Sequence, residues 1–434
     1  PNDARAHNEL GDLLAERGDE DGALEHFRQA VANEPSFHYV FYKMGRILAA
    51  RGETQEAIAS LDSSVTLDPS NQDAHYRLAH ELAGQGETER AIDEFHKAIA
   101  LNPDDARAHN EIGELLAARG DTEEAMKHYR EALRVAPEFV YVLSKMAKLL
   151  AAEGRYDEAI DLYQKALDIN PENQDVHYLM GCELASQGRI AEAKEHLEIA
   201  LKLNPGDARA HNDMGLLLGD TDPEAAIEHF KAALQIAPDF TLVLNNWGNL
   251  LASKSDYAGA DDRYREALRV RPTDEYAYYN LAKSAEARGH TEDAIECYEK
   301  AMVNSPDNSY IPNDLALLYS KLGRVEDAER MYRKGLDVDA ENPLIYNNLG
   351  YEAYKRGEVE EAIALYEKAL SVKADFVLAL NNLGTALGAV GRSDEAIQRF
   401  TSAIALRPED GNLQNSIGFE YAKPMMGAHE PCPV

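Results

Sequence analysis

This sequence has little cysteine and no long hydrophobic runs. Its 434 residues include only three cysteines, Cys182, Cys297 and Cys432, whose positions match neither a disulfide framework nor a zinc motif. No run of about 20 apolar residues occurs, so we expect no membrane insertion. So few cysteines favour a reducing compartment such as the cytoplasm, although a periplasmic or secreted protein can share this composition. The localisation therefore stays unassigned.

Basic residues are also few. Lysine and arginine number 44 against 77 aspartates and glutamates, which gives a formal net charge of −33. Such a charge repels phosphates, so we predict no nucleic-acid partner and favour basic partners. The chain begins at Pro1, so we expect a processed or trimmed product, and the lack of a signal peptide says nothing about its compartment.

Motifs for catalysis are missing too. The sequence contains no glycine-rich phosphate loop, no nucleophile elbow and no paired metal-ligand motif. Its histidines fall at packing positions of the repeat described below, and His429 with Cys432 has only a weak metal-like spacing. We therefore predict that the protein is not an enzyme and needs no cofactor.

Prolines, in contrast, recur at a fixed interval, and a period in this range is the signature of a solenoid or another repeat array. The interval is 34 residues, except for 33 between Pro205 and Pro238, and Ala340 and Ala374 take two of the places. The prolines of the series stand at 1, 35, 69, 103, 137, 171, 205, 238, 272, 306 and 408.

Each interval reads as two helices joined by a turn. In the fourth interval, Ile112 and Leu116 belong to one apolar stripe at helical spacing, and Ala125 and Tyr129 belong to a second. Gly120 lies between the stripes and suits a left-handed helix C-terminus. The pattern predicts a first helix, a tight turn and a second helix in every interval.

The spacing of bulky, Leu-Gly, Ala, aromatic, Ala and Pro positions resembles the tetratricopeptide repeat. That resemblance implies an all-α solenoid, a right-handed superhelix of helix-turn-helix repeats stabilised by stacking of neighbours. We count twelve repeats over residues 1–408, in three-repeat blocks 1–102, 103–204, 205–305 and 306–408, then a capping helix at 409–422 and an irregular tail at 423–434. In the first repeat the matching residues are His7, Leu10, Gly11, Leu14, Ala23, Phe27, Ala30 and Pro35.

Two repeats depart from the pattern. Repeat 7 lacks one residue between its helices, where Pro223 follows Asp222 and suits the first turn of the second helix. Repeat 10 carries Pro312 early in its first helix, so we expect this helix to start late. In the capping helix, we expect Pro424 to end the element.

The resemblance implies that positions two, five, six and nine of each first helix line a concave groove. In repeats 2, 3 and 5 these positions are basic, and tyrosines accompany them. The strip loosely resembles the carboxylate clamp of chaperone-binding members, although no three consecutive repeats satisfy that motif; alternatively, its cations pair with neighbouring acids such as Asp12 and Glu114. The candidate residues are Lys43, Arg46, Arg77, Lys145 and Lys148.

From repeat 8 onward the groove positions are neutral and rich in asparagine. A side-chain amide both donates and accepts, so it can bind an extended peptide backbone whatever its sequence. This series resembles the repeat region of the O-linked N-acetylglucosamine transferases, where asparagines hold substrate peptides. The candidates are Asn245, Asn246, Asn249, Asn280, Asn313, Asn347, Asn348, Asn381 and Asn382.

These features predict a non-enzymatic scaffold that binds extended peptide or protein segments in its groove. One alternative is the substrate-recruiting arm of a larger enzyme such as a glycosyltransferase. A second is a structural solenoid that forms homo-oligomers or filaments by end-to-end stacking.

A longer period overlies the 34-residue one. The phrase DARAHN occurs at residues 3, 105 and 207, which are 102 residues apart, and so it marks every third repeat. Duplication of a three-repeat block explains the spacing, and a partner with matching periodicity is the alternative. The signature residues are Arg5, Arg107, Arg209, Asn8, Asn110, Asn212, Glu9, Glu111 and Asp213.

Overall fold

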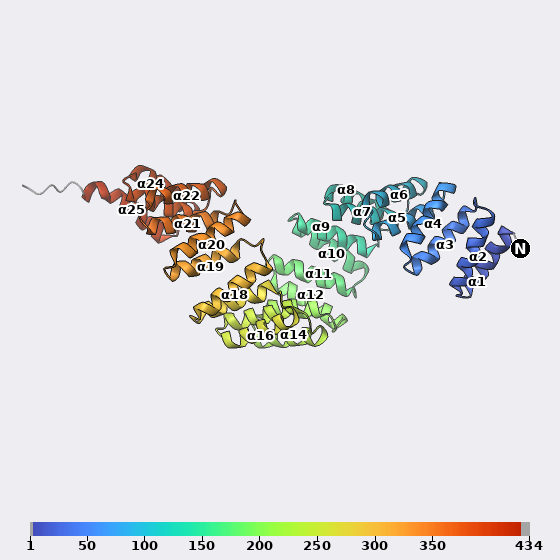
Figure 1. Ribbon diagram of the computed structural model, residues 1–434, viewed down its shortest axis with the longest axis horizontal. Coiled ribbons are helices and arrows are strands. Elements are labelled where there is room, and N and C mark those ends of the chain that lie inside the picture. Colours follow the sequence, from blue (N-terminus) through green and yellow to red (C-terminus); the bar gives the residue numbers. More distant parts are fainter. Residues whose placement is uncertain (1–2, 427–434) are drawn as a thin grey trace, which may run out of the picture. The chain divides into compact units, whose positions relative to one another are not determined.

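The computed structural model describes residues 3–426, and every regular element in that range is an α-helix. The chain divides between Leu217 and Leu218 into two compact parts, here called the N-terminal half and the C-terminal half. Consecutive helices pack in pairs within each half, and each pair packs on the next (Figure 1). Each half is therefore an α-solenoid, as the sequence predicts. None of the helices in the described residues is long and apolar enough to cross a membrane.

Odd-numbered helices are the first helices of the repeats, and even-numbered ones are the second. In the N-terminal half, which ends within α13, they are α1 Ala4–Glu16, α2 Glu20–Asn33, α3 His38–Ala50, α4 Thr54–Leu67, α5 Gln72–Gly84, α6 Thr88–Leu101, α7 Ala106–Arg119, α8 Thr122–Val135, α9 Val140–Ala152, α10 Tyr156–Ile169, α11 Gln174–Ser186, α12 Ile190–Leu203 and α13 Ala208–Leu218.

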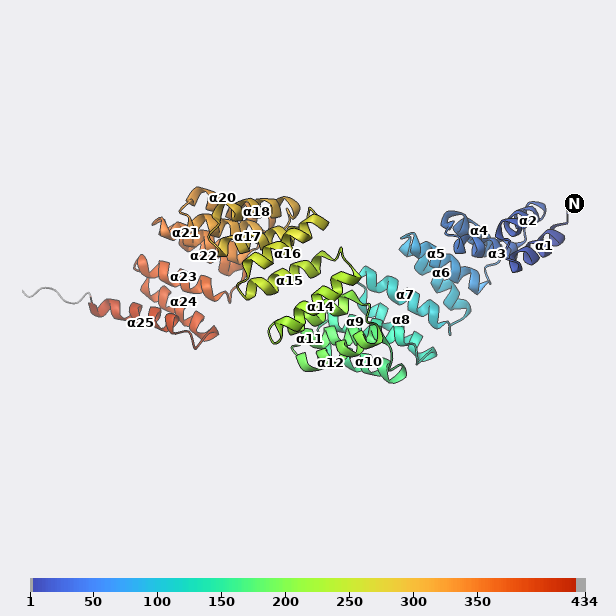
Figure 2. The same ribbon diagram turned by 90° about the horizontal axis from the view of Figure 1, so that it is seen from below.

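The C-terminal half continues the alternation, and Figure 2 shows its later helices from a second side. Its helices are α14 Pro223–Ile236, α15 Thr241–Ser253, α16 Tyr257–Val270, α17 Glu275–Ala287, α18 Thr291–Asn304, α19 Tyr310–Lys321, α20 Val325–Val338, α21 Pro343–Lys355, α22 Val359–Val372, α23 Val377–Ala389, α24 Ser393–Leu406 and α25 Gly411–Met426.

The two helices of a repeat approach closely because small residues face aromatic ones. A Cβ atom added to Gly113 would lie 2.6 Å from Cε1 of Tyr129, and one added to Gly350 would lie 2.7 Å from Cε1 of Tyr366. The aromatic rings themselves are buried, with Tyr129 and Tyr366 each 1% exposed. Stacking then joins the repeats, because the first helices α3, α5 and α7 also contact one another in order, as do α21, α23 and α25.

The turn inside a repeat uses a left-handed residue. Gly120 ends α7 with φ of 90°, and its N–H bonds back to the carbonyls of the last helical turn, as the sequence predicts. Repeat 8 is an exception, because Ser255 takes the left-handed conformation with φ of 66°. A side chain at that φ is strained, so repeat 8 forms the same turn at a higher free-energy cost.

Both expected departures occur. Helix α13 has 11 residues, and the turn after it ends at Asp222, whose carboxylate accepts a hydrogen bond from the Ala225 N–H while Pro223 occupies the first turn of α14. Helix α19 starts at Tyr310, so Pro312 lies in its first turn, where an N–H lacks an intrahelical partner in any case.

The C-terminal helix differs from expectation. Helix α25 runs to Met426, four residues beyond the expected end at 422, and it passes through Pro424. A proline near the end of a helix removes one backbone hydrogen bond, which does not stop the chain from keeping helical dihedrals for a further half-turn. The tail beyond 426, including the His429–Cys432 spacing, lies outside the described residues.

Candidate functional site

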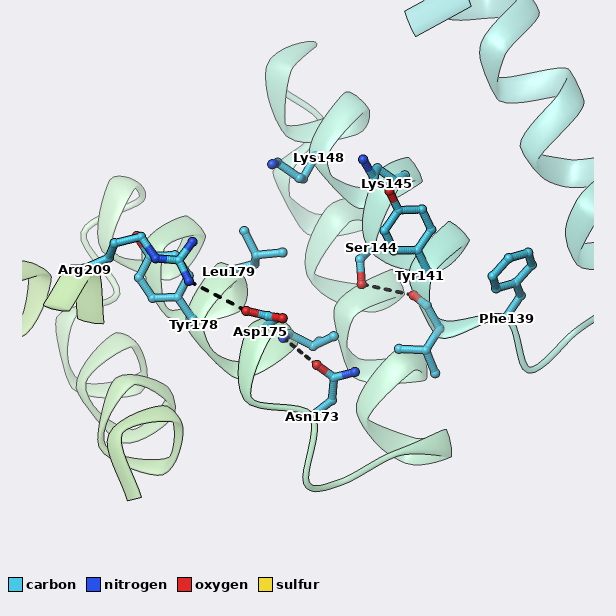
Figure 3. A pocket seen from close by; sticks show the side chains of 12 residues that line it. Phe139, Tyr141, Ser144, Lys145, Lys148, Asn173, Asp175, Tyr178, Leu179 and Arg209 are labelled. Carbon is cyan, nitrogen blue, oxygen red and sulfur yellow. Dashed lines mark hydrogen bonds and ion pairs between the residues drawn. The ribbon is translucent and has the colours of Figure 1, made fainter. Parts of the chain in front are cut away.

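First helices line the pockets of both halves. In the N-terminal half, α9, α11 and α13 enclose a volume of ≈ 510 Å³, which we call the cationic pocket (Figure 3). Eight of its twelve lining residues occupy positions two, five, six or nine of repeats 5–7. The lining residues are Phe139, Val140, Tyr141, Ser144, Lys145, Lys148, Asn173, Asp175, Val176, Tyr178, Leu179 and Arg209.

Two lysines give one wall of the cationic pocket its charge. Lys145 Nζ lies 3.5 Å from a Glu114 carboxylate oxygen and 4.7 Å from the centre of the Tyr141 ring. Burial disfavours its charged form, but interactions with Tyr141 and Glu114 outweigh burial and raise the pKa of Lys145. Lys148 is exposed and forms no ion pair with any described residue, so its ammonium group is available to a ligand.

Arg209 forms the opposite wall. Its guanidinium lies 4.7 Å from the centre of the Tyr178 ring, and two of its nitrogens donate to Asp207 at 3.2 and 2.9 Å. Asp207 is 6% exposed, and Gln174 Nε2 donates to it at 2.8 Å. The Tyr178 hydroxyl donates to Asp213 at 2.9 Å. Both the arginine and the tyrosine are therefore held by carboxylates of repeat 7.

The same arrangement occurs 102 residues earlier. Arg107 lies 4.8 Å from the centre of the Tyr76 ring, and its guanidinium donates to Asp105 at 3.3 and 3.1 Å. Gln72 Nε2 donates to Asp105 at 2.6 Å. The 102-residue signature thus has a structural role at two of its three occurrences, where it joins a repeat to the one before it.

The C-terminal half has a second pocket at the equivalent place. Helices α15, α17 and α19 enclose ≈ 430 Å³, which we call the amide pocket, and its lining includes four of the predicted asparagines. Among the described lining residues, Glu275 is the one whose side chain is charged at neutral pH. The lining residues are Leu242, Asn245, Asn246, Asn249, Glu275, Tyr276, Tyr279, Asn280, Asn308, Tyr310 and Ile311.

Several of the predicted asparagines hydrogen-bond within the protein. Asn348 Nδ2 donates to Asn313 Oδ1 at 2.9 Å, and Asn382 Nδ2 donates to Asn347 Oδ1 at 2.9 Å. Each bond joins position five of one repeat to position six of the next, so these amides connect neighbouring first helices. Asn381 is partly buried on the same face of α23.

The amide pocket uses its asparagines differently. Asn245 is 3% exposed and donates to the buried Asp274 at 3.3 Å, while Asn249 Oδ1 accepts from the Tyr264 hydroxyl at 2.8 Å. Asn280 is half-buried and has no hydrogen-bond partner among the described residues. The pocket therefore offers amide groups at its surface over a floor that is fixed by internal bonds.

The basic residues of repeats 2 and 3 line a third pocket, of ≈ 620 Å³, together with acids of repeat 1. Lys43 Nζ bonds to Asp12 at 2.7 Å and to Asn8 at 3.0 Å, so its charge is used internally. Arg46 and Arg77 are exposed and form no ion pair with described residues. Internal pairing thus accounts for Lys43 and Lys145, and it leaves Arg46, Arg77 and Lys148 without carboxylate partners.

Sequence reasoning missed part of both linings. Tyr178, Tyr276, Tyr279 and Tyr310 line the pockets, although they were not among the candidates, and Arg209 was selected for its recurrence alone. The tyrosines occupy positions two or five of first helices, and an aromatic residue at these positions is the sequence signal that identifies them. Among residues 3–426, no three or more His, Cys, Asp or Glu side chains are grouped to hold a metal ion.

Comparisons with known proteins agree with the repeat architecture. A family model described as the C-terminal domain of cilia and flagella-associated protein 70 matches residues 2–216. Tetratricopeptide repeat models match residues 245–309, 313–375 and 379–414. No curated protein matches the sequence.

One solved structure supports the same fold over nearly the whole chain. Yeast Tom70 matches with a TM-score of 0.53 and 17% identity, over 98% of this chain and 96% of that one. MamA protein is 26% identical over 40% of this chain and 94% of its own, with a TM-score of 0.38. YrrB, described as a TPR protein with an unusual peptide-binding site, is 26% identical over 42% of this chain and 95% of its own, with a TM-score of 0.36.

Proposed function

Because the chain belongs to the tetratricopeptide repeat family, we propose that it is a non-enzymatic scaffold that binds extended peptide segments along its first helices. The main observation behind this proposal is the cationic pocket, where three cationic side chains lie together in a protein whose net charge is −33. Its ligand is an acidic segment of another protein.

Charge and shape support this assignment together. Lys148 has no carboxylate partner among the described residues, and Lys145 has one at 3.5 Å, a distance that leaves donors free. Asp175 is the pocket's one acidic lining residue. Ammonium N–H groups that are not already paired bind carboxylates by charge-assisted hydrogen bonds. The neighbouring tyrosines supply apolar contact area.

The test compares acidic and neutral peptides by fluorescence anisotropy. We expect a labelled ten-residue peptide with four glutamates to bind, the same peptide with four glutamines to bind at least tenfold more weakly, and added salt to weaken the first. Lys148→Glu should remove binding of the acidic peptide. Lys165→Glu is the matched control, because Lys165 is exposed on the second helix of the same repeat, outside the pocket. Equal loss in both variants would show long-range repulsion and no pocket.

A further inference from the structure

The cationic and amide pockets are equivalent sites in two three-repeat blocks. Adding 101 to a residue number converts one lining into the other, because repeat 7 lacks one residue. The tyrosine of the middle repeat is shared, as Tyr178 and Tyr279. Its support is shared as well, because the hydroxyl of Tyr279 donates to Asp314 at 2.6 Å, as that of Tyr178 donates to Asp213 at 2.9 Å.

The residues around that tyrosine differ in charge between the two pockets. Lys145 and Lys148 correspond to Asn246 and Asn249, and Arg209 corresponds to Tyr310. Tyr276 corresponds to Asp175, and Glu275 corresponds to Gln174, which does not line the cationic pocket. The lining therefore changes from three cations and one acid to one acid and no cation.

Three aromatic rings of the amide pocket lack the guanidinium that covers Tyr178. Tyr276 and Tyr310 are each 61% exposed and have no ring contact with the described residues. Lys283 Nζ lies 6.0 Å from the centre of the Tyr279 ring, but it is bound to Asp314 at 3.3 Å. The faces of Tyr276 and Tyr310 are thus open to a ligand.

We propose that the amide pocket binds an arginine side chain of an extended partner segment. This inference rests on the proposed peptide-binding function. The guanidinium stacks on Tyr276 and Tyr310 and pairs with Glu275, while Asn280 binds the peptide backbone. The ring faces carry negative partial charge, which attracts a cation.

Arginine fits this pocket better than lysine. A planar guanidinium stacks on a tyrosine face and still donates in its own plane, whereas an ammonium group is a compact and strongly hydrated charge. The chain contains this geometry twice, because Arg107 on Tyr76 and Arg209 on Tyr178 lie 4.8 and 4.7 Å from the ring centres. An acidic segment, in contrast, meets Glu275 and no compensating cation.

The experiment uses four labelled peptides of one sequence that differ at two central residues, which are arginine, lysine, citrulline or glutamate. Binding to the full chain is followed by anisotropy and by the fluorescence of Trp247, the one tryptophan in the sequence, which lies on α15 beside Asn246. We expect the arginine peptide to bind at least fivefold more tightly than the lysine peptide, and the citrulline and glutamate peptides to bind more weakly still.

Variants separate the pocket from the general negative charge. Glu275→Gln and Tyr276→Ala should each weaken the arginine peptide at least fivefold, whereas Glu292→Gln, which removes one exposed acid on α18, should leave it unchanged. Tyr310→Arg should abolish binding, because it supplies the arginine that the equivalent position already has in repeat 7. Far-ultraviolet circular dichroism and the melting temperature confirm that each variant is folded.

The outcomes distinguish the two proposals. If the citrulline peptide binds as well as the arginine peptide, or if Tyr310→Arg binds normally, the arginine site is wrong even when the acidic peptide still binds the cationic pocket. If neither the acidic nor the arginine peptide binds, the groove proposal itself fails.

Discussion

The guanidinium of Arg209 lies over the ring of Tyr178, 4.7 Å from its centre, and this contact joins repeat 7 to repeat 6. Asp207, which directly precedes α13, accepts from the arginine at 2.9 Å, and Asp213 of α13 accepts from the tyrosine at 2.9 Å, so repeat 7 fixes both members. Because Arg107 and Tyr76 repeat the contact, the 102-residue spacing of the sequence corresponds to a recurring junction between repeats.

The junction between repeats 3 and 4 should contribute to stability through this pair. We expect Arg107→Ala and Tyr76→Leu each to destabilise the N-terminal half, and a double-mutant cycle to give a coupling of about 0.5–1 kcal/mol. Urea unfolding followed by circular dichroism measures it. Arg130→Ala is the control, since Arg130 is exposed on α8 and outside the junction. A coupling near zero would show that the stacking has no energetic role.

The left-handed turn of repeat 8 should be improvable. Ser255 has φ of 66°, where glycine avoids the strain of a Cβ atom, so Ser255→Gly should stabilise the C-terminal half by about 1 kcal/mol. Thermal unfolding measures the change. Ser253→Gly makes the same substitution in the last helical residue of α15 and should destabilise slightly. A gain of the same size in both variants would assign the effect to something other than the turn.

The sequence predicts the fold well because packing alone specifies it. The 34-residue period, the small residue at position eight and the bulky side chain on the second helix determine each helix pair, and Gly113 against Tyr129 shows the close approach directly. The late start of α19 at Tyr310 is confirmed for the same reason, because proline acts on the local backbone.

The site is less predictable because side-chain partners come from neighbouring repeats. Lys43 and Lys148 occupy equivalent faces, yet Lys43 binds Asp12 and Lys148 has no such acid. Likewise, Asn348 binds Asn313 while Asn280 has no described partner. A single residue's type does not reveal whether its donors are already used, and the block boundaries and the ligand roles stay predictions.

Acidic pH should destabilise the N-terminal half through His128. This ring is part-buried on α8, and its Nδ1 lies 3.1 Å from Nδ1 of His109. Burial, with the nearby His109 and His96 rings, lowers the pKa of His128 to about 4, while Glu124 and Glu131 oppose the shift.

The sign follows from proton binding. Between the ordinary histidine pKa of about 6.5 and the folded value near 4, the unfolded chain binds the proton more readily. Stability is therefore fully present above pH 6.5 and falls as the pH decreases toward 4, by about 1–3 kcal/mol. Urea midpoints from pH 7.5 to 4.5 test this expectation.

His128→Gln should reduce the pH dependence of the urea midpoint in that window. His290→Gln, which replaces an exposed ring, should leave the pH dependence unchanged. An unchanged pH dependence in His128→Gln would contradict the assignment.

Charge alone should decide which ligand each pocket selects, because the two linings share their backbone positions. Replacing Asn246 and Asn249 by lysine gives the amide pocket the cations of Lys145 and Lys148, so this double variant should bind the acidic peptide in its C-terminal half. Introduced on a Lys148→Glu background, it should restore the acidic-peptide binding that the background lacks, within about tenfold of the wild-type affinity. Trp247 follows Asn246 on α15, so a change in its fluorescence would indicate binding in the C-terminal half. No restoration would mean that two lysines are not sufficient and that a carboxylate site also needs a cation at the position of Tyr310, where the cationic pocket has Arg209.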